Sequence, residues 1–558
     1  MPVIRLSLSR IRSLLGRDLG ERDLEKLLMR LKSEVEGYSE GYVEVEVNSD
    51  RLDMMISEGV VRSLKGLLGI EVGLPIYRYR DSWIELEVSE VPQRRYIAMA
   101  VVRNINNSEG FIEELIQFQE KLHVTIGRRR RKVAIGIHDL SKIDSKICVY
   151  RELESDEKLV PLGYGRAMRV DEMIAETEQG RLYGSISIRD GKLPGIICGD
   201  KIISVPPVIN SELTRVTRST RDLLIDVTGT DLGYVEKTLE ILSTTLAESS
   251  SERVIERVSI RAPWGSGATP RGELRRIIVG RGYISEILDV GGISILDITR
   301  SLLSMRLGVG EILGDDVEVI VPPYRIDISG PIDVVEDIAM AMDLNSIEPE
   351  PLAAVLPGRP SMATHIRRRL RDIMIGLGFT EVYRHVLVSR EVLEILGYNS
   401  YLAIKNPVSS EMSAARPSII PSILDTLKSS QHAPKPVRVF EIGEVVVRDP
   451  GVYTGWRTGL YLAAGVLDDS VSFEDIQAPL FSLIRTLGLR PRTASAEYPV
   501  FIRGRSAYIY ADSHHVGVVG EIRLEMLRRM GIGFPAAVFE LDLLRLLEAI
   551  KNPKSRRS

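Results

Sequence analysis

The sequence predicts a multidomain protein of the α+β class. Its 558 residues are too many for one hydrophobic core, because domains usually hold roughly 100–200 residues, which allows about three to five of them. The composition, with 44% hydrophobic, 27% charged and 6% aromatic residues, excludes a wholly disordered, collagen-like or disulfide-scaffold chain. Segments with strand-like alternation are interleaved with segments of helical spacing, which favours mixed domains over all-α or all-β ones.

The first predicted domain, residues 1–83, is small and mixed. Leucines and a valine at helical spacing predict a helix over residues 24–35, and the alternation over 42–47 predicts a half-buried strand. A second helix is expected to begin near Ser57, with Glu58 in its first turn, where the helix dipole favours an acid. A Pro/Tyr/Arg-rich connector over 74–80 would close the domain.

The second domain is expected over residues 84–261, where strands at 96–102 and 133–137 are the clearest elements. Residues 262–270 have the composition of a loop and would end it. Residues 270–347 then predict a compact winged-helix-like module, with two short helices and a strand over 317–321.

The linker signal is strongest where Pro349, Pro351, Pro357 and Pro360 crowd together. The last domain, residues 361–548, follows it. An amphipathic helix over 366–377 and strands over 437–442 and 516–520 are its best-defined elements.

The charge balance is nearly even, with 73 Lys and Arg against 77 Asp and Glu, a net charge of −4. This argues against a histone-like or sliding nucleic-acid binder, so any polyanion must be met by local basic patches. Cys148 and Cys198 are far apart and have apolar neighbours, which predicts neither a disulfide framework nor a metal site. No apolar run long enough for a signal peptide or a membrane span appears. We therefore expect a cytoplasmic protein.

An acidic constellation lies near residue 330. Asp333, Glu336 and Asp337 fall at i, i+3 and i+4 on a helix opened by a Gly-Pro pair, and Asp327 is expected at the end of the preceding strand. Hard oxygen ligands in that number suit Mg²⁺. Acids in a first helical turn also complement the helix dipole without any metal, so spacing alone leaves both interpretations open.

Two basic clusters are candidates for phosphate contact. The run over residues 128–132 precedes an apolar strand and can present several cations to phosphates. It is also typical of a solvated hairpin. The second cluster, Arg367–Arg369 with Arg371, lies on the amphipathic helix and is expected to be its wet face.

A polar strand end offers a second candidate site. Asp226 and Thr228 lie two apart on a predicted strand and therefore point to the same side, and Ser204 leads toward them. Such a set can bind a hydroxyl group or orient a water molecule. The same residue types are equally common in turns and helix caps, where they bind the local backbone and have no functional role. The seven histidines form no zinc motif, and no phosphate loop or nucleophile elbow is present.

Taken in order, the motifs resemble one family along essentially the whole chain, the β subunits of phenylalanine–tRNA ligases in their short archaeal/eukaryotic form. The matching blocks, which are collinear, are Asn48-Ser49-Asp50-Arg51 with Asp53 and Glu58-Gly59, the stretch from Gly127 to Asp139, Pro206 to Ser211 with Asp226 to Thr230, Val321 to Asp327 with Glu336-Asp337, Asn406 to Glu411, and Phe440 to Glu444.

The resemblance implies an (αβ)₂ heterotetramer that attaches phenylalanine to tRNA(Phe). The α subunit would carry the adenylating site for ATP and phenylalanine, while the β subunit supplies editing, tRNA contacts and support. The second domain would then be an editing domain that hydrolyses mischarged tyrosyl-tRNA(Phe), with Ser204, Asp226 and Thr228 as pocket residues. Asp327, Asp333, Glu336 and Asp337 match the carboxylates that hold Mg²⁺ in the family.

The resemblance also implies that the last domain is a degenerate class II synthetase-like fold, an antiparallel sheet with helices. Arg438-x-x-Glu441 departs from the Arg-x-Glu that would hold ATP, and Ala536 stands where an arginine would be needed. Adenylation by this chain alone is therefore not expected. The alternatives are a standalone RNA-binding or assembly protein and a freestanding aminoacyl-tRNA deacylase, and dependence on a partner subunit would distinguish them.

Overall fold

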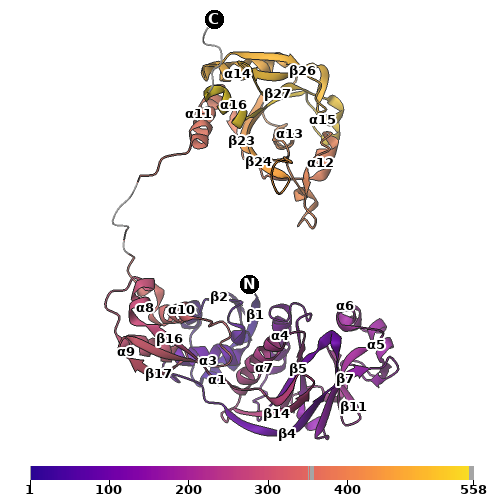
Figure 1. Cartoon of the computed structure of the whole chain (residues 1–558), viewed down its shortest axis with the longest axis vertical. Coiled ribbons are helices and arrows are strands. Elements are labelled where there is room, and N and C mark those ends of the chain that lie inside the picture. Colours follow the sequence, from indigo (N-terminus) through magenta and orange to yellow (C-terminus); the bar gives the residue numbers. More distant parts are fainter. Residues whose placement is uncertain (1, 350, 352–356, 552–558) are drawn as a thin grey trace. The chain divides into compact units, whose positions relative to one another are not determined.

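The computed structural model describes residues 2–349, 351 and 357–551, which form two compact units, Met1–Pro351 and Leu352–Ser558 (Figure 1). The predicted α+β multidomain class is confirmed. The proline-rich linker straddles the boundary, and its residues 350 and 352–356 lie outside the described part of the chain. None of the described helices has the length and apolar character needed to cross a bilayer.

The first unit begins with a three-stranded antiparallel sheet in the order β1-β3-β2. The predicted strand is β3, and the second predicted helix does begin at Ser57. The first predicted helix is shorter than expected, because Lys32 adopts a left-handed backbone (φ 56°) that turns the chain into the next strand. The elements are β1 (Val3–Ser7), α1 (Leu8–Leu15), α2 (Glu21–Arg30), β2 (Ser33–Ser39), β3 (Tyr42–Val47) and α3 (Ser57–Leu67).

A ten-stranded mixed sheet follows, in the order β12-β11-β10-β7-β4-β14-β5-β13-β6, with β15 paired to β14. Its strands are β4 (Arg78–Val88), β5 (Tyr96–Val102), β6 (Val133–Asp139), β7 (Ile147–Leu153), β10 (Leu193–Cys198), β11 (Lys201–Val205), β12 (Ile209–Asn210), β13 (Leu223–Gly229), β14 (Val254–Ala262) and β15 (Gly265–Thr269). Outside the sheet lie α4 (Phe111–Val124), the pair β8 (Lys158–Leu159) and β9 (Met168–Arg169), α5 (Val170–Glu176), α6 (Glu178–Ser187) and α7 (Leu232–Ala247).

Two expectations about which segments form strands of this sheet are wrong. The segment 262–270, expected to be a loop, contains β15, because it folds back on β14 as a hairpin. The expected connector 74–80 already contains the first residues of β4, which pairs in parallel with β14. Both segments are strands because they pair with β14, and not because their own side chains alternate.

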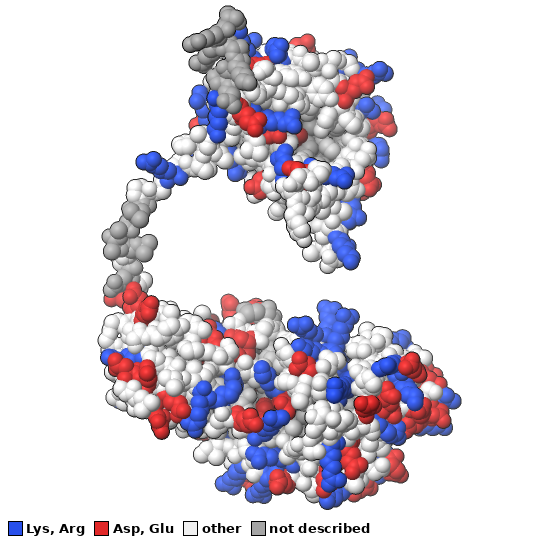
Figure 2. Space-filling model, viewed as in Figure 1, with Lys and Arg blue, Asp and Glu red and all other residues white. Residues whose placement is uncertain are grey.

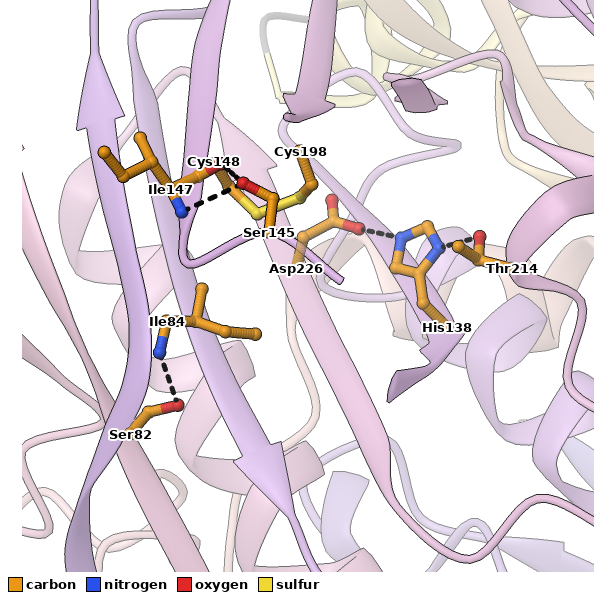
Figure 3. Close-up of a disulfide and its surroundings, with 9 residues drawn as sticks. All are labelled: Ser82, Ile84, His138, Ser145, Ile147, Cys148, Cys198, Thr214 and Asp226. Atoms are coloured by element: carbon orange, nitrogen blue, oxygen red, sulfur yellow. Dashed lines mark hydrogen bonds and ion pairs between the residues drawn. A yellow bond between two sulfur atoms is a disulfide. The ribbon is translucent and has the colours of Figure 1, made fainter. Parts of the chain in front are cut away.

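The expectation that the cysteines stay unpaired is also wrong. Cys148 in β7 and Cys198 in β10 lie directly opposite each other in an antiparallel register, with their Cα atoms 4.0 Å apart, and they form a disulfide (Figure 3). The pairing of two strands separated by 50 residues in the chain brings them together. The cysteines therefore no longer support the inference of a reducing compartment.

The winged-helix-like part has a three-stranded antiparallel sheet in the order β16-β18-β17, with three helices. The elements are β16 (Arg275–Gly280), α8 (Arg281–Leu288), α9 (Ile295–Ser304), β17 (Gly308–Leu313), β18 (Asp316–Val321) and α10 (Pro331–Met342). One cluster of buried apolar side chains runs from Ile4 to Met340. The three predicted ranges 1–83, 84–261 and 270–347 thus share a core.

The second unit is built on a seven-stranded sheet in the order β19-β23-β24-β28-β27-β26-β25, antiparallel except for β19 against β23. Alternate residues of β23 enter two separate cores, with Phe440 in one and Val439 in the other, as expected for a sheet covered on both faces. The strands are β19 (Thr380–Glu381), β23 (Val437–Arg448), β24 (Trp456–Leu467), β25 (Pro491–Ser495), β26 (Phe501–Ala511), β27 (His514–Ile522) and β28 (Ala536–Asp542).

Six helices surround this sheet in the described part of the second unit, and a small sheet in the order β20-β22-β21 stands apart from it. The helices are α11 (Met362–Gly376), α12 (Arg390–Ile395), α13 (Ile420–Ser430), α14 (Phe473–Thr486), α15 (Leu524–Met530) and α16 (Leu543–Lys551). The small sheet consists of β20 (Leu387–Val388), β21 (Leu402–Ala403) and β22 (Ala414–Ala415).

A buried carboxyl group links β28 to the start of α13. Glu540 is 5% exposed and accepts hydrogen bonds from the Ser418 hydroxyl (2.9 Å) and the Ile419 backbone N–H (2.6 Å). Burial raises the pKa of Glu540 to about 7, because the ionised carboxylate loses its hydration. The folded protein therefore holds a proton here that the unfolded chain, with an ordinary glutamate, releases at a lower pH.

This difference makes stability depend on pH. A carboxyl pKa raised in the folded state contributes stability that is complete below the unfolded value and is lost as the pH rises through about 7. Glu540→Gln keeps the shape of the side chain but cannot ionise. As the pH rises from 4.5 to 7.5, we expect the free energy of unfolding of this variant to increase, relative to that of the parent, by on the order of 3 kcal/mol. Urea unfolding of both proteins by circular dichroism measures this, and a difference independent of pH would refute the assignment.

Candidate functional site

The first unit contains a cavity of about 470 Å³ between α4, the strand β6 and the turn that joins β11 to β12. Its walls are largely apolar, with Ile112, Leu115, Ile116, Ile135, Val208 and Ile209 among the lining side chains. The polar lining residues are Gln119, Glu120, Arg130, Ser204, Asn210, Ser211, Thr214, Asp226 and others. An apolar cavity with a few convergent polar groups is the usual form of a site for a small organic group.

Asp226 lies in the middle of β13, which pairs with β5 on one side and β6 on the other. The register sets it directly opposite Gly136. A Cβ atom at position 136 would lie 1.9 Å from the Asp226 carboxylate, so glycine is the residue that leaves room for it. The carboxylate therefore sits over the backbone of β6, where it is 1% exposed.

The carboxylate is held by His138, two residues further along β6. Asp226 Oδ2 accepts a hydrogen bond from His138 Nε2 at 2.8 Å, and His138 Nδ1 lies 2.7 Å from the Thr214 hydroxyl. Figure 3 shows Asp226 and Thr214 on opposite sides of the ring. Because an ionised carboxylate only accepts hydrogen bonds, Nε2 carries the proton, and Nδ1 accepts from the Thr214 hydroxyl in the neutral ring. The chain Thr214–His138–Asp226 thus orients the carboxylate.

Ser204 stands on another wall, where β11 pairs with β12. The register places it opposite Asn210, and its hydroxyl donates to Asn210 Oδ1 at 3.0 Å. The Asn210 amide reaches the Ile137 carbonyl at 3.4 Å, which connects this wall to β6. With its proton engaged, the Ser204 oxygen keeps lone pairs that can accept a hydrogen bond.

Thr228 is separated from the other two predicted residues. It is fully buried and is not among the residues that line the cavity. Arg94 donates through Nε to the Thr228 hydroxyl and through Nη2 to the Thr228 carbonyl, both at 2.8 Å. Burial lowers the pKa of this guanidinium to about 10. The structure therefore places Ser204 and Asp226 in the cavity wall. Thr228 lies outside the cavity, where it anchors Arg94.

Sequence reasoning did not single out His138 or Thr214 as site residues. The available signal was that Gly136 and His138, two residues apart, lie on the same face of a predicted strand. This becomes informative only when β6 is known to pair with β13. Asp226 and His138 are 88 residues apart in the chain.

The predicted magnesium carboxylates each have a partner within the protein. Arg325 donates to Asp337 through both terminal nitrogens, at 2.7 and 2.9 Å, and to Asp327 at 2.7 Å. Asp337 is 1% exposed, and burial raises its pKa although Arg325 opposes this. Asp327 lies in the turn that follows β18 and not at the strand end.

The other two carboxylates face different partners. Asp333 accepts from the backbone N–H groups of Ser329 (2.7 Å) and Gly330 (2.9 Å) at the start of α10; partial burial would raise its pKa, but these N–H groups lower it. Glu336 pairs with Lys32 at 3.0 Å. Within the described chain, three possible ligands gather at Glu34, Glu36 and Glu46, and not here. As they stand, the four carboxylates do not fit Mg²⁺: Asp333 lies in the first turn of α10, where the helix dipole favours an acid, and the other three pair with Arg325 or Lys32.

The second unit holds its own buried ion pair. Arg416 Nη2 contacts Glu441 at 2.7 Å, and both side chains are almost completely buried. Arg416 also donates to the Glu444 carbonyl and the Ser422 hydroxyl, each at 2.9 Å. Glu441 is thus held by a structural arginine, while Arg438 on the same strand is exposed and Ala536 is buried without a polar side chain.

Comparison with known proteins covers most of the chain. Three family models match it: the B3/4 domain over residues 101–261, the tRNA synthetase B5 domain over 279–343, and the phenylalanyl tRNA synthetase beta chain CLM domain over 349–543. The phenylalanine–tRNA ligase β subunit of Aeropyrum pernix is 42% identical over 548 residues, which is 97% of this chain and 98% of that one.

The chain belongs to the phenylalanine–tRNA ligase β subunits. The β subunit of Sulfurisphaera tokodaii is 41% identical over 526 residues, 94% of this chain and 96% of the relative. A solved N-terminal fragment of the phenylalanyl-tRNA synthetase β subunit from Pyrococcus horikoshii matches with a TM-score of 0.58 at 33% identity, covering 61% of this chain and 99% of that fragment. The predicted family is confirmed, and the cavity lies within residues 101–261, which the B3/4 domain model matches.

The close approach of Gly136 to Asp226 gives a direct test of the site geometry. In Gly136→Ala, the new methyl group would collide with the carboxylate and separate it from His138. We expect a loss of about 3 kcal/mol in the free energy of unfolding, from overpacking and a lost buried hydrogen bond to a charged group. Gly165→Ala, where nothing lies within 4 Å of the added atom, is the matched control. Equal urea midpoints for the two variants would contradict the geometry.

Proposed function

We propose that this chain acts with a phenylalanine–tRNA ligase α subunit, as an (αβ)₂ heterotetramer in the cytoplasm, to attach phenylalanine to tRNA(Phe) at the expense of ATP. We further propose that the Asp226 cavity hydrolyses tyrosyl-tRNA(Phe) formed in error. The observation that carries the editing proposal is the set of oriented polar groups, Ser204 with Asn210 and Asp226 with His138, inside walls that are largely apolar.

The cavity suits an aromatic side chain that bears a hydroxyl group. Apolar walls from α4 and β6 accept the ring, while Asp226 and Ser204 offer acceptors for a phenolic O–H. Phenylalanine in the same place would offer no hydrogen bond to the remaining lone pairs of Asp226 and Ser204, which is unfavourable for buried acceptors. Selection for the wrong amino acid thus follows from polarity, with no need to exclude phenylalanine by size.

Hydrolysis needs no covalent intermediate on the protein. A water oxygen attacks the ester carbonyl, the bond to the 3′ oxygen of the tRNA breaks, and the proton lost by the water ends on that oxygen. Asp226, oriented by His138, is placed either to read the phenol or to accept a proton from the water. Ser204 donates its proton to Asn210, so we assign it to binding and not to nucleophilic attack.

The second unit supports a division of labour with the α subunit. Glu441, the carboxylate of the motif that would hold ATP, is buried and paired with Arg416. Position 536, where an arginine would be needed for the nucleotide, is a buried alanine. We therefore assign adenylation to the α subunit. If the chain were instead a freestanding deacylase, it would hydrolyse tyrosyl-tRNA equally well in the absence of the α subunit.

The editing proposal predicts a selective loss. In the co-purified α–β enzyme, Asp226→Ala should lower the rate of tyrosyl-tRNA(Phe) hydrolysis at least about 100-fold, because the group that reads the hydroxyl or holds the water is gone. Phenylalanylation should stay within about twofold of the parent rate. Both are measured with radiolabelled amino acid and purified tRNA(Phe).

Asp200→Ala, which removes an exposed carboxylate from the turn between β10 and β11, is the control and should hydrolyse like the parent. Unchanged hydrolysis in Asp226→Ala would rule out the cavity. Equal loss of hydrolysis and phenylalanylation would show that the substitution acts on folding or assembly.

We propose that the isolated chain does not bind Mg²⁺ tightly at the four predicted carboxylates. In the chain by itself, Arg325 and Lys32 already neutralise Asp327, Asp337 and Glu336. We expect equilibrium dialysis to find far less than one equivalent of Mg²⁺ on the isolated chain. One tightly bound equivalent that disappears in Asp327→Asn would contradict this and restore the four-carboxylate site.

A further inference from the structure

The fold divides the basic run Arg128–Lys132 into a half-buried anchor, Arg130, three free arginines and Lys132, which has partners of its own. Arg130 turns inward: its Nη1 donates to the Pro207 and Val208 carbonyls, both at 3.1 Å, and its Nη2 contacts Glu120 at 2.6 Å. Its guanidinium also lies 4.2 Å from the centre of the Tyr183 ring. Arg130 therefore forms part of the cavity wall.

The backbone around this anchor has an unusual conformation. Arg128, Arg129 and Arg130 all have positive φ, at 47°, 55° and 62°, which is sterically costly for residues with a side chain. Hydrogen bonds close the loop, from Lys132 N–H to the Gly127 carbonyl at 2.9 Å and from Arg94 Nη1 to the Arg130 carbonyl at 3.1 Å. Arg94 is the same residue that holds Thr228, so the loop is tied to the strand that carries Asp226.

The three remaining arginines point away from these contacts. Arg128, Arg129 and Arg131 are exposed, and within the part of the chain that the structure describes none of them has an ion pair, a side-chain hydrogen bond or an aromatic partner. Lys132, by contrast, lies 3.4 Å from the centre of the Tyr234 ring and 3.8 Å from Asp231. Three unpaired guanidinium groups thus flank a residue of the cavity wall.

The rest of the surface does not explain this concentration. Figure 2 shows Lys and Arg interspersed with Asp and Glu over the visible face of the first unit, and the net charge of the chain is −4. On such a surface a polyanion can be held only where local cations lack acidic neighbours. The loop meets that condition beside the cavity.

We propose that Arg128, Arg129 and Arg131 bind backbone phosphates of the single-stranded 3′ end of an RNA whose terminal ester enters the Asp226 cavity. This rests on the proposed editing function and names the part of the substrate that the loop contacts. The contacts of Arg130 and Arg94 hold the loop backbone in place before the RNA arrives, which reduces the ordering cost of binding. Phosphate contact positions the ester without reading sequence.

The test is RNA binding by the full chain, measured without an ester so that hydrolysis plays no part. The probe is a fluorescein-labelled RNA hairpin with the acceptor stem and single-stranded 3′ end of a tRNA. In the triple variant Arg128→Gln, Arg129→Gln, Arg131→Gln, we expect the Kd to rise at least about tenfold and the slope of log K against log salt to fall by about 2, as for three single-strand phosphate contacts.

The matched control is Arg17→Gln, Arg22→Gln, Lys26→Gln, which removes the same charge from side chains elsewhere on the unit that are exposed and make no ion pair with the described residues. It should change the Kd less than about twofold. A hairpin without the 3′ overhang should bind parent and triple variant alike. In tyrosyl-tRNA hydrolysis by the α–β enzyme, the triple variant should raise KM about tenfold with kcat within about twofold.

Parent-like RNA binding by the triple variant would overturn the proposal. So would equal weakening toward the blunt hairpin, which assigns the loop to duplex RNA, or loss of α-subunit co-purification, which assigns it to a protein interface. If the enzyme hydrolyses no tyrosyl-tRNA but the binding results hold, the editing proposal fails while the loop's contact with the 3′ strand stands.

Discussion

The pairing of β13 with β6 is the constraint on which the candidate site depends. This register sets Asp226 over Gly136 and brings it within hydrogen-bonding distance of His138. A slip of one residue would turn the carboxylate to the other face of the sheet, because side chains alternate with a period of two. The absence of a side chain at Gly136 and the contact with Thr214 then hold the carboxylate beside an apolar cavity.

Buried arginines connect segments that are distant in the chain. Arg94 joins Thr228 to the backbone of the basic loop, Arg62 links Asp53 to the face of the Tyr324 ring, and Arg325 gathers Asp327 and Asp337. Each guanidinium has several donors in a planar fork, so one side chain can satisfy two or three acceptors at once. In the first unit these contacts join parts that share one apolar core. Arg94 also holds the backbone of the loop Arg128–Lys132 beside the cavity.

Much of the local structure could be predicted from sequence patterns. The strands β3 and β5 match their predicted ranges, and Pro331 opens α10 as the Gly-Pro pair indicated. The periodicity and capping of these elements' own residues identify them, whichever strands they pair with; β5, for example, pairs with β13 and β14, which are distant in the chain. The failures lie where a paired strand decides the structure: β15 and the start of β4 are strands because they pair with β14, and Cys148 meets Cys198 because β7 pairs with β10.

The sequence by itself determined the α+β class, the family and the presence of Ser204 and Asp226 in a polar strand-end motif. Only the tertiary structure decided that these two share a cavity while Thr228 supports it, that Arg130 is an anchor among three free arginines, and that three of the four predicted magnesium carboxylates pair with Arg325 or Lys32. The physical reason is that a side chain's role depends on its partner. Residue type and spacing specify which charges and hydroxyls are available, but the folded chain decides which are paired and which remain free for a ligand.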